Sequence, residues 1–149
     1  MSLEITINEK IKQAMLAKND VALRGLRAIK AAILLAKTSA AKTSEITEEE
    51  ELKILQKLAK QRKESLEIFE KQNRPDLAII EKQELETIES FLPAQMSEDE
   101  ISAELKKIIA EVGASSITDL GKVMGVASKF FAGKADGKLV AQLVKTLLA

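Results

Sequence analysis

Glycine and lysine recur together in the last quarter of the chain, in a pattern that could hold a phosphate group. Five of the six glycines lie between residues 113 and 137, and residues 112–149 contain five lysines but only two acidic residues. Glycine lets a ligand approach the backbone closely, while lysines and helix N-termini attract phosphate oxygens. The candidate binding residues are Lys122, Gly125, Lys129, Gly133, Lys134, Gly137 and Lys138. These residue types favour contact with a nucleic-acid backbone without readout of base edges.

Three of these candidates fall on one face of a predicted helix. Its apolar residues recur at steps of three and four, and they occupy one sector of the helical wheel, about 120° wide. These residues are Leu120, Val123, Met124, Ala127, Phe130 and Phe131. Lys122, Gly125 and Lys129 lie opposite. Because glycine on a solvated helix face costs about 1 kcal/mol relative to alanine, we expect Gly125 to permit close approach of a ligand or of the N-terminal part of the chain.

Residues suited to catalysis are scarce. The chain has no cysteine and no histidine, which removes thiolate chemistry and the commonest general base and metal ligand. The glycines do not form a phosphate loop, because they lack the strand-to-helix context and the Gly-Lys-Ser/Thr ending. Glutamates 48–51 are consecutive, so on a helix they diverge rather than converge on a cation. The sequence therefore predicts no catalytic residue, no metal site and no cofactor.

The glycine and lysine positions resemble the signature of the GatB/YqeY family. The C-terminal matches are residues 113–116 (Gly-Ala-Ser-Ser), 121–125 (Gly-Lys-Val-Met-Gly) and 133–140 (Gly-Lys-Ala-Asp-Gly-Lys-Leu-Val). Upstream, residues 60–65 and Phe91-Leu92-Pro93 are similar to free-standing YqeY-like proteins, so the resemblance covers the whole chain. Two departures are Phe91, where tyrosine is expected, and the apolar richness of residues 127–132.

This resemblance implies a function in RNA binding. The chain is similar to the tail of the B subunit of tRNA-dependent amidotransferases, which is associated with the outer elbow of tRNA, where shape rather than sequence is recognised. It implies a non-catalytic tRNA-binding module related to carbon-nitrogen ligases that use glutamine as amide donor. The protein partner that it suggests is an amidotransferase or a synthetase.

Two other functions stay open beside tRNA binding. The chain could be a protein-interaction adaptor that docks through its C-terminal helices. It could also be an amidotransferase in its own right, but it has no cysteine and no evident Ser-Lys amidase pattern. An amidase partner would then have to supply that chemistry.

Composition favours a soluble, helical, cytoplasmic protein. The 149 residues are 46% apolar and 31% charged, with only 3% aromatic residues, and no apolar run approaches the roughly 20 residues that cross a bilayer. We therefore expect no membrane partner. The net charge of zero divides into +5 for residues 1–43, −8 for 44–111 and +3 for 112–149. Such basic ends attract phosphate locally, although solvated helix faces are the simpler interpretation.

The periodicity predicts an all-α chain of two domains. An N-terminal helical hairpin or bundle domain spans residues 1–94, and a small three-helix domain spans 95–149, with the boundary set by Leu92-Pro93. The helices are expected at 2–18, from Asp20 past Ala36, from Thr47 to about 72, and at 76–91, 97–112, 116–133 and 136–148. Capping boxes are expected at Thr47 with Glu50, Ser97 with Glu100 and Ser116 with Asp119, and N-caps at Asp20 and Asp136. Met15 is expected on the apolar side of the first helix, Pro75 at the first position of the fourth, and Gly133 in the left-handed conformation that ends a helix. A mobile loop is expected at residues 38–45.

Basic residues also cluster in the N-terminal part. The third predicted helix carries Lys57, Lys60, Arg62 and Lys63. Lys60 with Glu64, and Lys63 with Glu67, are four apart, so ion pairs along the helix explain much of this cluster, with tRNA contact as the alternative. Arg24, Arg27 and Lys30 lie on the flank of the preceding helix, and their contact with RNA stays open.

Overall fold

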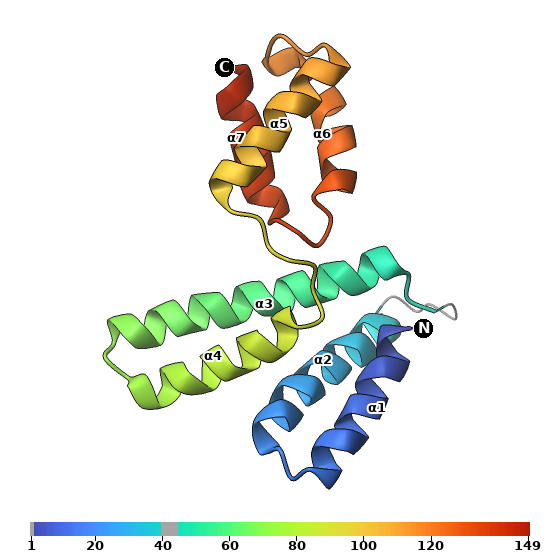
Figure 1. Cartoon of the computed structure of the whole chain (residues 1–149), viewed down its shortest axis with the longest axis vertical. Helices are drawn as coiled ribbons and strands as arrows, with labels where there is room; N and C mark the ends of the chain where they lie inside the picture. Colours follow the sequence, from blue (N-terminus) through green and yellow to red (C-terminus); the bar gives the residue numbers. More distant parts are fainter. Residues whose placement is uncertain (1, 40–44) are drawn as a thin grey trace. The chain divides into compact units, whose positions relative to one another are not determined.

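The computed structural model describes residues 2–39 and 45–149, and within them the chain is all-helical, as predicted. Seven α-helices and one short 3₁₀-helix, η1, follow one another in this described part (Figure 1). Their bounds are α1 Leu3–Leu16, α2 Asp20–Ser39, α3 Glu48–Lys71, α4 Pro75–Glu89, α5 Glu98–Val112, η1 Ile117–Asp119, α6 Leu120–Phe130 and α7 Gly137–Leu148. The helices form two compact units, Met1–Leu92 (unit 1) and Pro93–Ala149 (unit 2).

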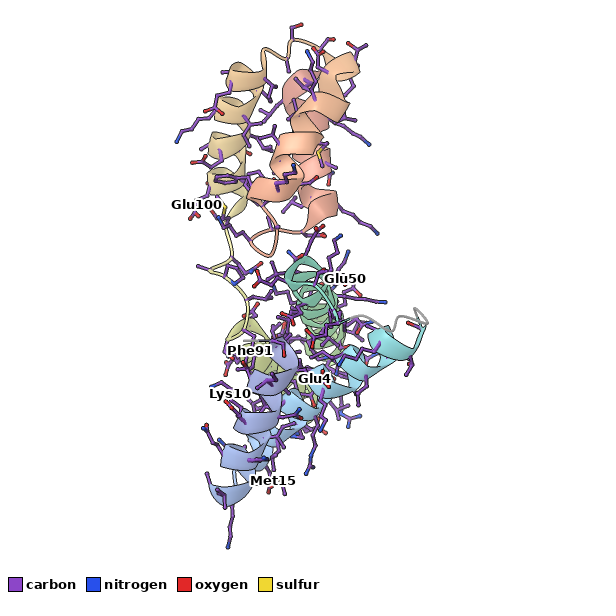
Figure 2. All side chains as sticks on the ribbon, turned by 90° about the vertical axis from the view of Figure 1, so that its right-hand side faces the viewer. Glu4, Lys10, Met15, Glu50, Phe91 and Glu100 are labelled. Carbon is purple, nitrogen blue, oxygen red and sulfur yellow. The ribbon has the colours of Figure 1, made fainter. Side chains whose placement is uncertain are left out.

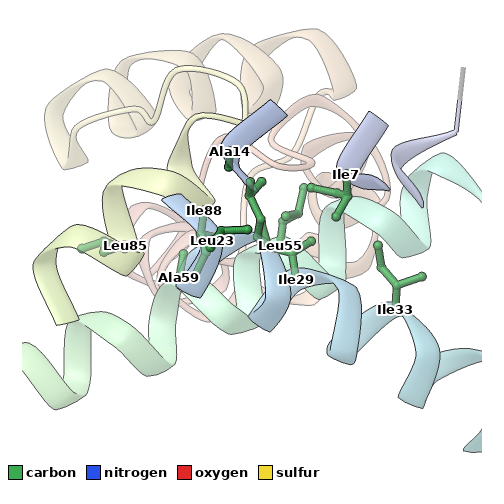
Figure 3. Packing of buried hydrophobic residues seen from close by; sticks show 10 residues of the cluster. Ile7, Ala14, Leu23, Ile29, Ile33, Leu55, Ala59, Leu85 and Ile88 are labelled. Atoms are coloured by element: carbon green, nitrogen blue, oxygen red, sulfur yellow. The ribbon is translucent and has the colours of Figure 1, made fainter. Parts of the chain in front are cut away.

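Unit 1 consists of two helical hairpins, α1 with α2 and α3 with α4 (Figure 1). Helix α2 joins them, because it also packs against α3 and α4. The side chains of Ile7, Ile29, Leu55 and Ile88 are almost fully buried in the shared core (Figure 3). The three-four spacing of apolar residues on each helix places them on this inner side. Met15, expected on the apolar side of the first helix, is instead 56% exposed near the C-terminal end of α1.

Several helix ends in unit 1 follow the predicted capping chemistry. Thr47 forms the expected capping box with Glu50, and Pro75 occupies the first turn of α4. The start of α2 differs from the prediction, since the side-chain oxygen of Asn19, not Asp20, accepts a hydrogen bond from the Ala22 amide at 3.1 Å. Helix α2 also continues to Ser39, so Thr38 does not lie in a loop as expected; residues 40–44 of that predicted loop lie outside the described residues.

Two basic residues of the α3 cluster, Arg62 and Lys63, pair across the hairpin with carboxylates of α4. The Arg62 guanidinium lies 3.1 Å from Glu81 and 3.0 Å from Glu84, both on α4. The predicted partner of Lys63 was wrong, because its ammonium lies 3.2 Å from Glu89 of α4 rather than pairing with Glu67. Periodicity within one helix cannot show which side chains a second helix brings within reach. The Arg62 guanidinium is therefore occupied by two ion pairs within the α3–α4 hairpin.

Unit 2 is a three-helix arrangement in which α5, α6 and α7 contact one another in pairs. Its core contains Ile101, Leu105, Val123, Val140 and Val144, each at most 1% exposed. Ser97 caps α5 by accepting a hydrogen bond from the Glu100 amide at 3.2 Å. Gly113 ends α5 with a φ of +68°, a conformation that glycine adopts at little cost.

No helix within residues 2–39 and 45–149 has both the length and the apolar character needed to cross a membrane.

Candidate functional site

The outer face of α6 carries the first group of predicted site residues. Lys122, Gly125 and Lys129 are all exposed, opposite the buried Val123 and Ala127. A methyl group added to Gly125 would meet no atom of the described residues within 4 Å. Gly125 therefore serves no close packing within unit 2, and in that unit the backbone between the two lysines is open.

The start of α6 is fixed by a carboxylate. Asp119 accepts hydrogen bonds from the backbone amides of Ser115 at 2.9 Å and Ser116 at 3.3 Å, so the predicted contact from Asp119 back to Ser116 is confirmed. These two amides, and the positive charge of Lys122 to a smaller extent, lower the pKa of Asp119 below its ordinary value. The first turn is the 3₁₀-helix η1, so the α-helix begins at Leu120, four residues after the predicted start at Ser116.

The loop after α6 is shaped by Gly133. Its φ is +74°, the left-handed conformation expected of it, although α6 already ends at Phe130. The Gln95 side-chain amide donates a hydrogen bond to the Gly133 carbonyl at 2.7 Å, and the Met96 amide donates one to the Lys134 carbonyl at 3.0 Å. Gly133 is buried, so it fixes the course of the loop rather than offering a surface to a ligand. Gln95 carries no sequence pattern that indicates this contact.

At the start of α7, Gly137 and Lys138 are exposed, and Asp136 is the predicted N-cap. The Asp136 carboxylate accepts a hydrogen bond from the Lys138 amide at 3.4 Å. A negative charge thus already lies at the amides that a phosphate would use. The Lys138 side chain remains available, but the helix N-terminus is a weaker candidate than the face of α6.

Phe130 does not lie where the wheel predicted. It is 40% exposed, whereas its neighbour Phe131 is buried and packs edge-on against it with ring centroids 5.0 Å apart. The Lys134 ammonium lies 4.8 Å from the centroid of the Phe130 ring, a cation-π contact. Phe130 lies at the edge of the predicted apolar sector, in one row with Val126, which is also exposed, at 42%. Through this contact with Phe130, Lys134 of the following loop lies next to the exposed face of α6.

The charged residues of α6 and α7 are all basic. Helices α6 and α7 contain Lys122, Lys129, Lys138 and Lys145 and no acidic residue. The two carboxylates nearest in sequence, Asp119 and Asp136, are hydrogen-bonded to backbone amides at the helix starts. An anion that contacts α6 thus meets lysines without a carboxylate from the same helix.

The family of the chain is shown by a comparison with protein families, in which the model of the Yqey-like protein family matches residues 4–148. The chain belongs to the YqeY-like family. A search of curated proteins found no match. The resemblance of the C-terminal motifs to the amidotransferase tail is consistent with this family.

In this YqeY-like chain, unit 1 contains a groove of about 540 Å³, and none of the predicted site residues lines it. It runs between α1, α2 and α4, and Lys10 and Phe91 are among its lining residues. Both are labelled in Figure 2, and the Lys10 ammonium lies 5.9 Å from the centroid of the Phe91 ring. Within the described residues, no three His, Cys, Asp or Glu side chains are grouped so that they could hold a metal ion.

Proposed function

We propose that this YqeY-like chain is a non-catalytic tRNA-binding module whose unit 2 holds the RNA by its phosphate backbone. The observation that carries the proposal is the open backbone at Gly125 between exposed Lys122 and Lys129. A larger residue at position 125 would keep a ligand away from the helix. Two lysines beside a bare stretch of helix can instead contact phosphates while the RNA lies close to the backbone.

The charge distribution supports a local electrostatic attraction. Because α6 and α7 carry only basic charged residues, phosphates near them meet no acidic side chain of these helices. The whole chain has a net charge of zero, so long-range steering of RNA should be weak. We therefore expect binding that depends on close contact and on salt concentration.

The choice of tRNA as the ligand is supported by the family. The C-terminal glycine and lysine motifs resemble the amidotransferase tail, and that resemblance implies recognition of tRNA shape. The chain has neither cysteine nor histidine, so a related amidation reaction would take its chemistry from a partner enzyme. The module would then contribute affinity for the RNA.

The test is an electrophoretic shift of total tRNA by the wild type and by Lys122→Gln/Lys129→Gln. The matched control is Lys106→Gln/Lys107→Gln, which makes the same change in net charge on exposed positions of α5. Loss of the shift in the first variant and its retention in the second would support the α6 face. Equal loss in both variants would indicate a general charge effect, and absence of a shift with wild-type protein would refute tRNA binding.

A protein-interaction adaptor is the second candidate, and exposed apolar side chains favour it. Ile117, Val126 and Phe130 are 48%, 42% and 40% exposed in unit 2. Phenylalanine is enriched in protein interfaces, whereas lysine is depleted there. A partner bound through this surface should keep its affinity when Lys122 and Lys129 are replaced by glutamine.

A further inference from the structure

Phe130 is distinguished from the other aromatic residues by its exposure. The chain has four phenylalanines and neither tryptophan nor tyrosine. Phe131 is buried, Phe69 and Phe91 are half-buried, and Phe130 alone of the four is exposed. Burial of a phenylalanine side chain stabilises a fold, so a ring that is 40% exposed forgoes part of that stabilisation. The exposed ring offers a flat apolar surface that a ligand can contact.

The surroundings of Phe130 are basic. Residues 122, 126 and 130 are spaced by four and form one row along α6, while 125 and 129 form the adjacent row. All five are exposed, and we call them the α6 face: Lys122, Gly125, Val126, Lys129 and Phe130. Lys134 adds to this basic surface: its ammonium lies over the Phe130 ring, 4.8 Å from the centroid, so a base that stacks on that face displaces it.

We infer that Phe130 is a stacking platform for a nucleobase of the RNA, with the lysines of the α6 face on the flanking phosphates. This inference rests on the proposed function and adds to it a contact with a base. An aromatic ring bordered by lysines matches the alternation of flat bases and charged phosphates along an RNA strand. A protein-binding surface would instead be expected to exclude lysine from its centre. Stacking is tolerant of sequence, as recognition by shape requires.

The first test replaces the ring and keeps an apolar side chain. Phe130→Leu should lower the affinity for tRNA by about 5- to 150-fold, the range for loss of one stacked base. The slope of affinity against salt should not change, because stacking neutralises no phosphate. The melting temperature should stay close to that of the wild type, since the side chain is already exposed. Unchanged tRNA affinity in this variant, with normal binding by the wild type, would overturn stacking but leave the proposed function intact.

The second test uses the absence of tryptophan from the chain. Phe130→Trp introduces a single tryptophan whose ring can stack, and its fluorescence should be quenched as tRNA saturates the protein. The control is Ile79→Trp, on an exposed position of α4. Its emission should not respond to tRNA. Bound tRNA that leaves the emission of Phe130→Trp unchanged would overturn the inference. Failure of wild-type protein to bind tRNA would refute both this inference and the proposed function, and would favour a protein partner for the α6 face.

Discussion

Gly25 of α2 lies directly against Thr87 of α4. A Cβ atom on residue 25 would come within 2.7 Å of both the Cβ and the Cγ2 of Thr87, which is closer than real Cβ atoms approach. Gly25 is buried, so the two helices cross here with no space for a side chain. The position of α2 on the α3–α4 hairpin thus depends on one glycine.

Gly25→Ala should therefore destabilise the protein, although alanine favours helix. The threonine is β-branched and its Cβ is fixed to the backbone, so relief requires movement of a helix, at a cost of typically 1 to 3 kcal/mol. Gly121→Ala is the control, because a Cβ there would meet no described atom within 4 Å. Urea unfolding should show opposite changes in the two variants. A Gly25→Ala variant as stable as the wild type would show that this crossing is looser than described.

The Gly125→Gln variant should separate stability from binding. Glutamine is a better helix former than glycine and meets open space, so the free energy of unfolding should rise by a few tenths to about 1 kcal/mol. The added side chain should weaken tRNA binding, because it lifts the RNA from the α6 backbone. The melting curve and the tRNA affinity of the one variant measure both effects. A lower melting temperature, or raised stability with unchanged tRNA affinity, would show that Gly125 does not serve close approach of the RNA to α6.

Asp119 should make the stability of unit 2 sensitive to acid. Its pKa is lowered in the folded chain, so its carboxylate contributes stability that is present above its unfolded pKa, near 3.9, and is lost as the pH falls through the lower folded value. Asp119→Asn should be less stable than the wild type at pH 7, and the gap should narrow below about pH 4. Glu111→Gln controls for the change in net charge. A gap that stays constant from pH 7 to pH 3 would contradict the contact of Asp119 with the amides.

The segment between the two compact units should be cut before either unit unfolds. Pro93 and Ala94 are exposed, whereas Gln95 and Met96 are hydrogen-bonded to the α6–α7 loop. Brief digestion with subtilisin should therefore cleave near residues 92–94 and yield two fragments with separate melting transitions. Recovery of only the intact chain until global unfolding would mean that the units are not independent domains.

Local chemistry explains why much of the fold could be predicted from the sequence. The Thr47 capping box, Pro75 at the start of α4 and the left-handed Gly133 all depend on residues close in sequence. The partner of Lys63 and the crossing at Gly25 depend on contacts between helices, which periodicity does not specify.

The candidate site divides in the same way. The exposure of Lys122, Gly125 and Lys129 follows from the wheel and is confirmed, whereas Phe130 lies at the edge of the apolar sector, where the wheel does not decide between burial and exposure. The wheel treated position 130 as the edge of a continuous stripe. The role of Gln95 in holding the loop could not be predicted, because it depends on a carbonyl 38 residues away in the sequence.

The most direct test of phosphate-backbone binding is the affinity of the whole chain for tRNA, measured from about 50 to 200 mM salt, the range over which phosphate contacts show most clearly. The logarithm of the association constant should fall linearly with the logarithm of salt concentration, by about 0.7 to 0.9 per neutralised phosphate. In Lys122→Gln/Lys129→Gln the slope should be shallower by about 1.4 to 1.8, the equivalent of two contacts. An affinity for tRNA that hardly changes with salt, or a slope that this variant leaves unaltered, would contradict binding through the α6 face.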